Sequence, residues 1–155
     1  MVEVELQWGI KPLDFLSKAQ CEDWVQASLV GVLASEANEL TIRVVDPEES
    51  QTLNRAYRAT DKPTNVLSFE FEQPPGLVDL GEALPYLGDL VVCAQIVEQE
   101  AKQHNKPLVE HWAHMIVHGT LHLQGYDHIE PEDAQEMEAL EVKIMHGLGF
   151  NHPYE

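Results

Sequence analysis

One segment of this chain is apolar on almost every side of the helix that it would form. Hydrophobic residues in Leu108–Leu123 are spaced so that they cover the whole circumference. These residues are Leu108, Val109, Trp112, Ala113, Met115, Ile116, Val117, Leu121 and Leu123. Pro107 opens the segment and Gly125 lies just beyond its end, as proline and glycine commonly do at helix boundaries. A helix without a polar face is buried in the core, so we expect the rest of the chain to fold around this one.

The other segments show strand and helix patterns in mixed order. Strands are predicted at residues 2–8, 39–46, 65–71 and 87–94, where apolar and polar residues alternate or β-branched residues gather. Helices are predicted at residues 12–35, 47–57, 95–104 and 131–148, and loops at residues 58–64 and 73–85. Interspersed elements of this kind favour an α+β fold, with a mixed sheet of about four strands and helices packed on it. The apolar helix would lie at its centre.

The length and composition fit one domain that spans residues 1–155. No apolar stretch approaches the roughly 20 residues that cross a bilayer, and the first residues are acidic where a signal peptide would be basic. Cys21 and Cys93 lie far apart and in no motif, so we interpret both as small buried apolar residues rather than a disulfide. We therefore expect a cytoplasmic protein that does not associate with membranes.

The charge is strongly negative, with 9 lysines and arginines against 27 aspartates and glutamates and a net charge of −18. This excludes broad, non-specific nucleic-acid binding, which depends on neutralising phosphates. It leaves room for a local basic site, because Arg55, Arg58 and Lys62 supply a third of the basic residues within eight positions. Residues 130–141 hold six acidic residues and no basic one, and we interpret them as the solvated face of a helix.

Histidines on the apolar helix predict a metal site. His118 and His122 are four residues apart, so their side chains are neighbours on one face of the helix. Gly125 allows the chain to turn back, which would bring His128 to the same ion. Three protein ligands leave a fourth position open for water, as in catalytic zinc sites. We predict that His118, His122 and His128 bind one zinc ion, although nickel or another transition metal would also suit imidazole ligands.

The neighbouring polar residues have less specific interpretations. His114, one turn before His118, could support a ligand or face the substrate, but it could equally be a packed core histidine. Asp127 could orient the imidazole of His128, or it could cap the turn. His104 and His111 are interpreted as ordinary residues.

The spacing of the three histidines around Gly125 matches the zinc helix of the metzincin proteases, H-E-x-x-H-x-x-G-x-x-H. That pattern places a general-base glutamate directly after the first histidine, where this chain has Gly119. Without the carboxylate that takes a proton from zinc-bound water, peptide hydrolysis is the weaker prediction.

A second informative stretch begins at Arg58 and continues through a polar loop into a predicted strand. A cation near a metal site suits a phosphodiester substrate, because it offsets the charge that builds on phosphorus. Arg58 and Lys62 could instead pair with some of the many carboxylates of the chain. The residues alone leave these two interpretations equally open.

Three stretches together resemble the bacterial YbeY family. They are RATDKPTNVLSF at residues 58–69, LGDL at residues 87–90, and HGTLHLQGYDH at residues 118–128. The resemblance implies a metal-dependent, single-strand-specific endoribonuclease that acts in rRNA maturation, including 3′ end processing of 16S rRNA, and in ribosome quality control. It also implies metal ligands at His118, His122 and His128 and a functional arginine at Arg58, so that Arg58 and His118 are the predicted catalytic residues.

An acidic protein cannot hold RNA through its overall charge. We therefore predict a cleft lined by Arg43, Arg55, Arg58 and Lys62, and partners among the small ribosomal subunit and its proteins, whose basic tails an acidic surface would attract. Two alternatives remain. One is a zincin-like metalloprotease or other metallohydrolase. The other is a non-catalytic zinc-containing ribosome assembly factor, in which a fourth protein ligand would close the metal site.

Overall fold

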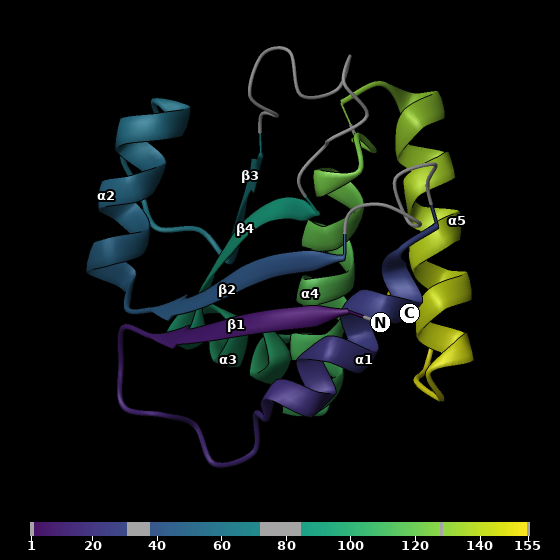
Figure 1. The fold of residues 1–155 in the computed structure, drawn as a ribbon, viewed down its shortest axis with the longest axis horizontal. Coiled ribbons are helices and arrows are strands. Elements are labelled where there is room, and N and C mark those ends of the chain that lie inside the picture. Colours follow the sequence, from purple (N-terminus) through teal and green to yellow (C-terminus); the bar gives the residue numbers. More distant parts are fainter. Residues whose placement is uncertain (1, 31–37, 72–84, 128, 155) are drawn as a thin grey trace.

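The computed structural model describes residues 2–30, 38–71, 85–127 and 129–154. Four strands form one sheet in the order β1-β2-β4-β3 (Figure 1). Its strands are β1 (Glu3–Trp8), β2 (Glu39–Val45), β3 (Val66–Glu70) and β4 (Tyr86–Cys93). The first three strands in this order are parallel, and β3 pairs antiparallel with β4 at the edge. The predicted mixed four-stranded sheet is confirmed.

Five helices accompany the sheet within the described residues. They are α1 (Lys18–Ser28), α2 (Pro47–Arg58), α3 (Ala94–Gln103), α4 (Leu108–Leu123) and α5 (Pro131–Gly147). The α+β class is therefore confirmed. None of the helices in this part of the chain is long and apolar enough to cross a bilayer.

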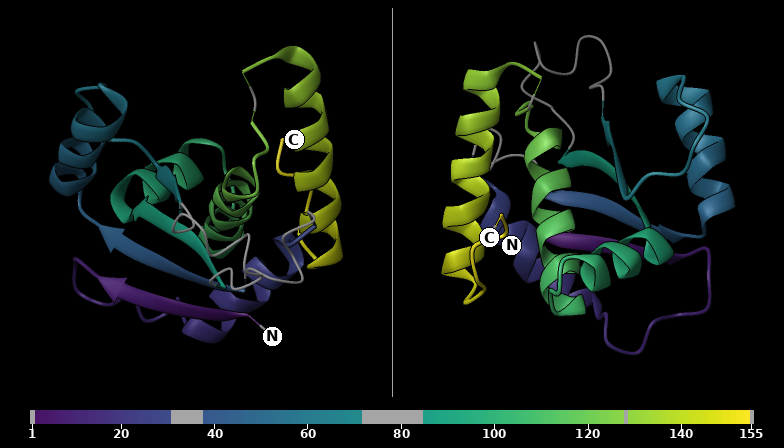
Figure 2. Two further views of the ribbon diagram at one scale, coloured as in Figure 1. Left: turned by 45° about the horizontal axis from the view of Figure 1, so that its top comes forward. Right: turned by 180° about the vertical axis from the view of Figure 1, so that it is seen from behind.

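Helix α4 is the central element, as its composition predicts. Alternate residues of β2 and β4, among them Ile42, Val44, Leu90 and Val92, pack in one core with α4. Figure 2 shows α4 between the sheet and α5, with α2 on the opposite side of the sheet. The face that α2 covers has a smaller core, to which Leu67 and Val91 contribute. The sheet and α5 together enclose α4, so few of its side chains reach solvent.

The N-terminal helix is shorter than predicted. Helix α1 begins at Lys18 rather than residue 12, because Ser17 forms a capping box with Gln20 and fixes the helix start there. It ends at Ser28, and the predicted continuation over residues 31–35 lies outside the described residues, as does the predicted loop over residues 73–85 except for its last residue. The earlier apolar residues Leu13 and Leu16 still pack on the core. The prediction relied on the burial of apolar residues alone and therefore placed the start of the helix too early.

Both cysteines are buried and neither forms a disulfide. Burial raises the pKa of the Cys21 thiol to about 12. The interpretation of Cys21 and Cys93 as small apolar core residues is confirmed.

Candidate functional site

A cleft of about 630 Å³ lies between the edge strand β3 and the C-terminal end of α4. It is lined by Arg58, Thr64, Asn65, Val66, Leu67, Ser68, Glu70, His118, His122, Gly125, Tyr126 and Asp127. The cleft thus brings together two sequence motifs that are about 60 residues apart, and the antiparallel addition of β3 to β4 forms its wall.

His118 and His122 present their ring nitrogens to each other across one helical turn. The two Nε2 atoms are 3.1 Å apart, and the ring planes are inclined by 82°. Two imidazole nitrogens on one tetrahedral zinc ion, each about 2.0–2.1 Å from it, are about 3.3 Å apart. The side chain of His118 is 21% exposed although most of α4 is buried, so it is reachable from the cleft. The pair therefore has the chemistry and spacing that two ligands of one ion require.

The chain reverses direction directly after this pair. The backbone N–H of Gly125 donates to the His122 carbonyl at 3.0 Å, and that of Tyr126 donates to the Leu121 carbonyl at 3.2 Å. Together they form a Schellman motif, and Gly125 has the left-handed φ of +95° that this motif requires. The predicted turn at Gly125 is confirmed.

The third predicted ligand, His128, lies outside the described residues. Over the parts of the chain that the structure describes, no three His, Cys, Asp or Glu side chains form a group that could hold a metal ion. Asp127 precedes His128 in the sequence. Its carboxylate accepts a hydrogen bond from the backbone N–H of Ile129 at 3.2 Å, so Asp127 caps the turn.

Glu141 lies behind His118 on the side away from the cleft. His118 Nδ1 is 2.7 Å from one of its oxygens and His114 Nε2 is 3.0 Å from the same oxygen, while the Tyr154 hydroxyl donates to the other at 2.6 Å. Burial raises the pKa of this fully buried carboxyl, but the hydrogen bonds from His114 and His118 and the other nearby groups outweigh burial and lower it to about 2.

The interpretation of residues 130–141 as a solvated face is wrong for Glu141, which is 0% exposed. The sequence held a signal for this position. Glu141 lies one turn after Met137 and one turn before Met145, and both are buried on the inner face of α5. A carboxylate at that spacing within an apolar stripe is buried, and a buried carboxylate needs hydrogen-bonding partners.

The two histidines that precede His118 on α4 are also buried. His114 Nε2 is 3.0 Å from Glu141, so His114 is a buried, hydrogen-bonded histidine that does not line the cleft. His111 Nε2 is 3.0 Å from a Glu100 oxygen. Burial lowers the pKa of His111, and the contact with Glu100 opposes this shift. Among the residues that the structure describes, the buried Nδ1 atoms of both histidines have no hydrogen-bond partner.

The packing around Gly119 disfavours the protease glutamate at this position. A Cβ atom at this position would lie 2.8 Å from Leu90 Cδ2 and 3.3 Å from Ser68 Oγ. The Ser68 hydroxyl also donates to the Gly119 carbonyl at 3.2 Å, so β3 lies close against the helix. A glutamate here would require the buried Leu90 side chain of β4 to shift.

Arg58 is the last residue of α2 and reaches into the same cleft. Its guanidinium donates to the Ser68 carbonyl at 2.6 Å and to the Tyr57 carbonyl at 3.2 Å, and its central carbon lies 5.1 Å from the centre of the Phe69 ring. No carboxylate forms an ion pair with Arg58 in the part of the chain that the structure describes. Backbone carbonyls and an aromatic ring hold it in place.

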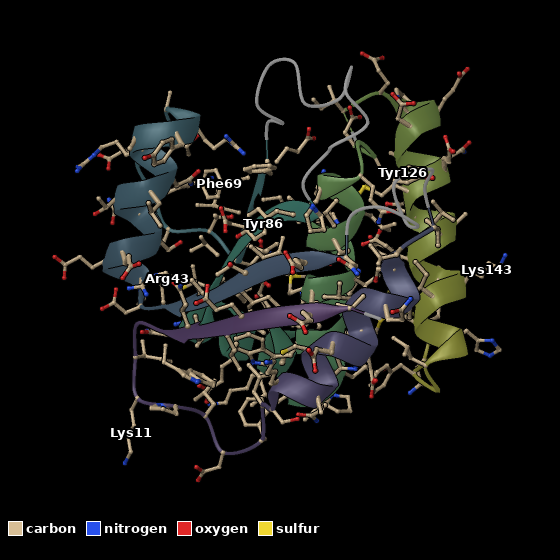
Figure 3. The ribbon with its side chains drawn as sticks, viewed as in Figure 1. Lys11, Arg43, Phe69, Tyr86, Tyr126 and Lys143 are labelled. Carbon is tan, nitrogen blue, oxygen red and sulfur yellow. The ribbon has the colours of Figure 1, made fainter. Side chains whose placement is uncertain are left out.

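The predicted set of basic residues around the cleft is wrong apart from Arg58. Arg43 pairs with Glu49 at 2.5 Å on the α2 side of the sheet, and Arg55 lies 3.7 Å from Asp61. Figure 3 shows Arg43 beside α2, well away from Tyr126, which lines the cleft. Lys62 is exposed and does not line the cleft either. These residues are close in sequence but do not gather at the cleft, because Arg43 lies on β2, Lys62 lies after α2, and Arg55 pairs with Asp61.

The α+β fold thus places a histidine pair and an arginine in one cleft. The Endoribonuclease YbeY family model matches residues 10–149. The chain is 60% identical to Endoribonuclease YbeY of Hydrogenovibrio crunogenus over 136 residues, which cover 88% of this chain and 85% of that protein. It is also similar to the solution structure of TM1509 from Thermotoga maritima, with 25% identity and a TM-score of 0.54 over 92% of this chain and 86% of the other. The chain belongs to the YbeY family of hydrolytic nucleases.

Proposed function

We propose that this protein is a metal-dependent endoribonuclease that cleaves single-stranded RNA. The observation that carries the proposal is that His118, His122 and Arg58 line one cleft. A phosphodiester placed in this cleft would contact the arginine and the histidine pair together. The similarity to Endoribonuclease YbeY of Hydrogenovibrio crunogenus supports RNA as the substrate.

His118, His122 and His128 would hold the metal ion. The fit is chemical, because neutral imidazole nitrogens are the ligands that zinc, nickel and similar first-row metals accept. It is also geometric for the described pair, whose Nε2 atoms are 3.1 Å apart and face the cleft. A bound ion would supply Lewis-acid assistance to the attack of water on phosphorus.

Arg58 would bind the phosphate and offset the charge that grows on it in the transition state. Its guanidinium is oriented before substrate arrives, because two carbonyl oxygens and the Phe69 ring fix its plane. Two hydrogen bonds use only part of its five N–H groups, so others are available to a phosphate oxygen. A planar, fixed donor fork suits a phosphate better than a flexible ammonium would.

The biological substrate that we propose is rRNA, with 3′ end processing of 16S rRNA and ribosome quality control as the setting. A net charge of −18 gives RNA little general attraction to the surface. The same charge would attract the basic proteins of the small ribosomal subunit, which could deliver their RNA to the cleft. The family membership and this charge balance support the proposal.

The competing functions make different demands on the cleft. A zinc protease of the metzincin type needs a carboxylate where Gly119 packs against Leu90, so the packing disfavours it. A purely structural zinc site needs no arginine, whereas Arg58 is held at the cleft without an ion-pair partner among the described residues.

The deciding experiment is an assay of the purified protein on a labelled single-stranded RNA, before and after treatment with a chelator. Cleavage that the chelator abolishes and that added zinc or nickel restores is the expected result. A double-stranded RNA of the same sequence is the matched substrate control and should be cut far more slowly. Cleavage that survives complete metal removal would refute the metal-dependent mechanism.

A further inference from the structure

One carboxylate lies directly behind the histidine pair and is enclosed on all sides. Glu141 of α5 is 0% exposed, and side chains from α4 and from the C-terminal residues converge on it. A buried carboxylate is costly unless it is paired and hydrogen-bonded. Contact between α4 and α5 alone would need only apolar residues here, like Met137 and Met145 on the same face of α5.

The contact with His118 determines which ring nitrogen faces the cleft. An ionised carboxylate only accepts hydrogen bonds, so the 2.7 Å contact places a proton on His118 Nδ1. His118 Nε2 then keeps its lone pair on the side of His122. Metal-binding histidines commonly donate their other N–H to a carboxylate, which fixes the tautomer and makes the ligand nitrogen more basic.

The partners of Glu141 restrain it from the other directions. His114 Nε2 donates to the oxygen that also accepts from His118, which leaves His114 Nδ1 as a buried acceptor with no partner in the described part of the chain. The Tyr154 hydroxyl donates to the second oxygen. Three donors from two different segments therefore fix the carboxylate in one orientation.

We propose that Glu141 is a positioning residue that holds His118 in the Nδ1–H form with Nε2 directed at the metal, and that His114 and Tyr154 hold Glu141 in turn. The inference rests on the proposed metal binding by His118 and His122. It assigns a function to a residue on a helix that contributes no ligand to the proposed metal site.

The first test is the zinc affinity of Glu141→Gln, measured by competition with a chromophoric chelator in the absence of RNA. Glutamine keeps the size of the side chain and one acceptor oxygen but removes the charge. We expect zinc affinity to fall by about 10–100-fold, and the visible absorption bands of the cobalt(II)-substituted protein to shift. Glu136→Gln makes the same chemical change at an exposed position of α5, and it should bind zinc like the unmodified protein.

Tyr154→Phe tests the outer part of the network with little risk to folding. Tyr154 is 47% exposed, so removal of its hydroxyl leaves the packing largely unchanged. We expect a smaller loss of zinc affinity than in Glu141→Gln, because Glu141 keeps its contacts with both histidines. An affinity identical to that of the unmodified protein would remove Tyr154 from the proposal.

The second test needs no variant and decides the matter if Glu141→Gln does not fold. Long-range nitrogen–proton NMR of the metal-free protein, under mildly alkaline conditions where free imidazole is neutral, reports the tautomer of each histidine. We expect the Nδ1–H form for His118 and the Nε2–H form for His114. A predominantly Nε2–H form for His118, or unchanged zinc affinity in folded Glu141→Gln, would overturn the inference. Failure of the zinc-loaded protein to cleave RNA would instead refute the proposed function.

Discussion

Replacing Arg58 by alanine separates a catalytic arginine from a structural one. The change removes two hydrogen bonds to backbone carbonyls and the contact with Phe69. The side chain lies at the surface, where such a cation–aromatic contact contributes about 0.5–1 kcal/mol. The two hydrogen bonds add about 0.5–1.5 kcal/mol each, so a total loss of about 1.5–4 kcal/mol should lower the melting temperature of a domain of this length by about 3–16 °C. If Arg58 offsets charge in the transition state, its loss should lower the cleavage rate about 10²-fold or more, or about 3 kcal/mol.

The assay compares cleavage rate, zinc content and melting temperature in Arg58→Ala, Arg58→Lys and Arg55→Ala. Arg55 is three residues earlier on the same helix and pairs with Asp61 at the surface, so it is the matched control and should retain normal cleavage. Lysine should restore only part of the activity, because a point charge cannot make the bidentate contact of a guanidinium. Normal cleavage by Arg58→Ala would refute the reasoning, as would a loss of activity that follows a loss of folded protein.

Three further changes test the site and its framework. His118→Ala should lower zinc content and RNA cleavage together, and full zinc content by elemental analysis would exclude His118 as a ligand. Gly119→Ala should destabilise the fold by up to about 2 kcal/mol in chemical unfolding, because the added methyl group meets Leu90 and the strain exceeds the gain in helix propensity. Equal or higher stability of Gly119→Ala would show that the Leu90 side chain can shift at little energetic cost. Ser17→Ala should cost about 1 kcal/mol through loss of the hydrogen bond to the Gln20 backbone, and unchanged unfolding would contradict the importance of that cap.

The central helix was predictable because local and tertiary signals agree there. Pro107 and Gly125 mark its two ends, and its apolar circumference requires burial from every direction. The predicted bounds therefore coincide with those of α4. The position of the histidine pair follows from the helix alone, since residues four apart share a face. The bounds of α4 and the pairing of its histidines could be predicted because both depend on residues close together in the sequence.

The parts that could not be predicted depend on contacts between distant segments. Nothing near Glu141 in the sequence indicates that His118 and Tyr154 will meet it, because one contact depends on how α5 packs against α4 and the other on how the C-terminal residues fold back along α5. The basic residues Arg43 and Arg55 are close to Arg58 in the chain, yet Arg43 on β2 pairs with Glu49 and Arg55 on α2 pairs with Asp61. Proximity in sequence therefore did not predict which basic side chains line the cleft.

The histidines of α4 also show how a buried helix can carry polar chemistry. His111 and His114 are costly in a core unless they are hydrogen-bonded, and a carboxylate from a neighbouring helix meets each of them. The two carboxylates differ in one respect. Glu100 has a side chain that is 30% exposed, so water can replace it, whereas Glu141 is fully buried and one of its oxygens contacts both His114 and His118. Loss of Glu100 should therefore be tolerated, while loss of Glu141 leaves a buried donor without a partner next to the proposed metal ligands. The orientation of His118 on the buried helix α4, and with it the geometry of the histidine pair, therefore depends on Glu141.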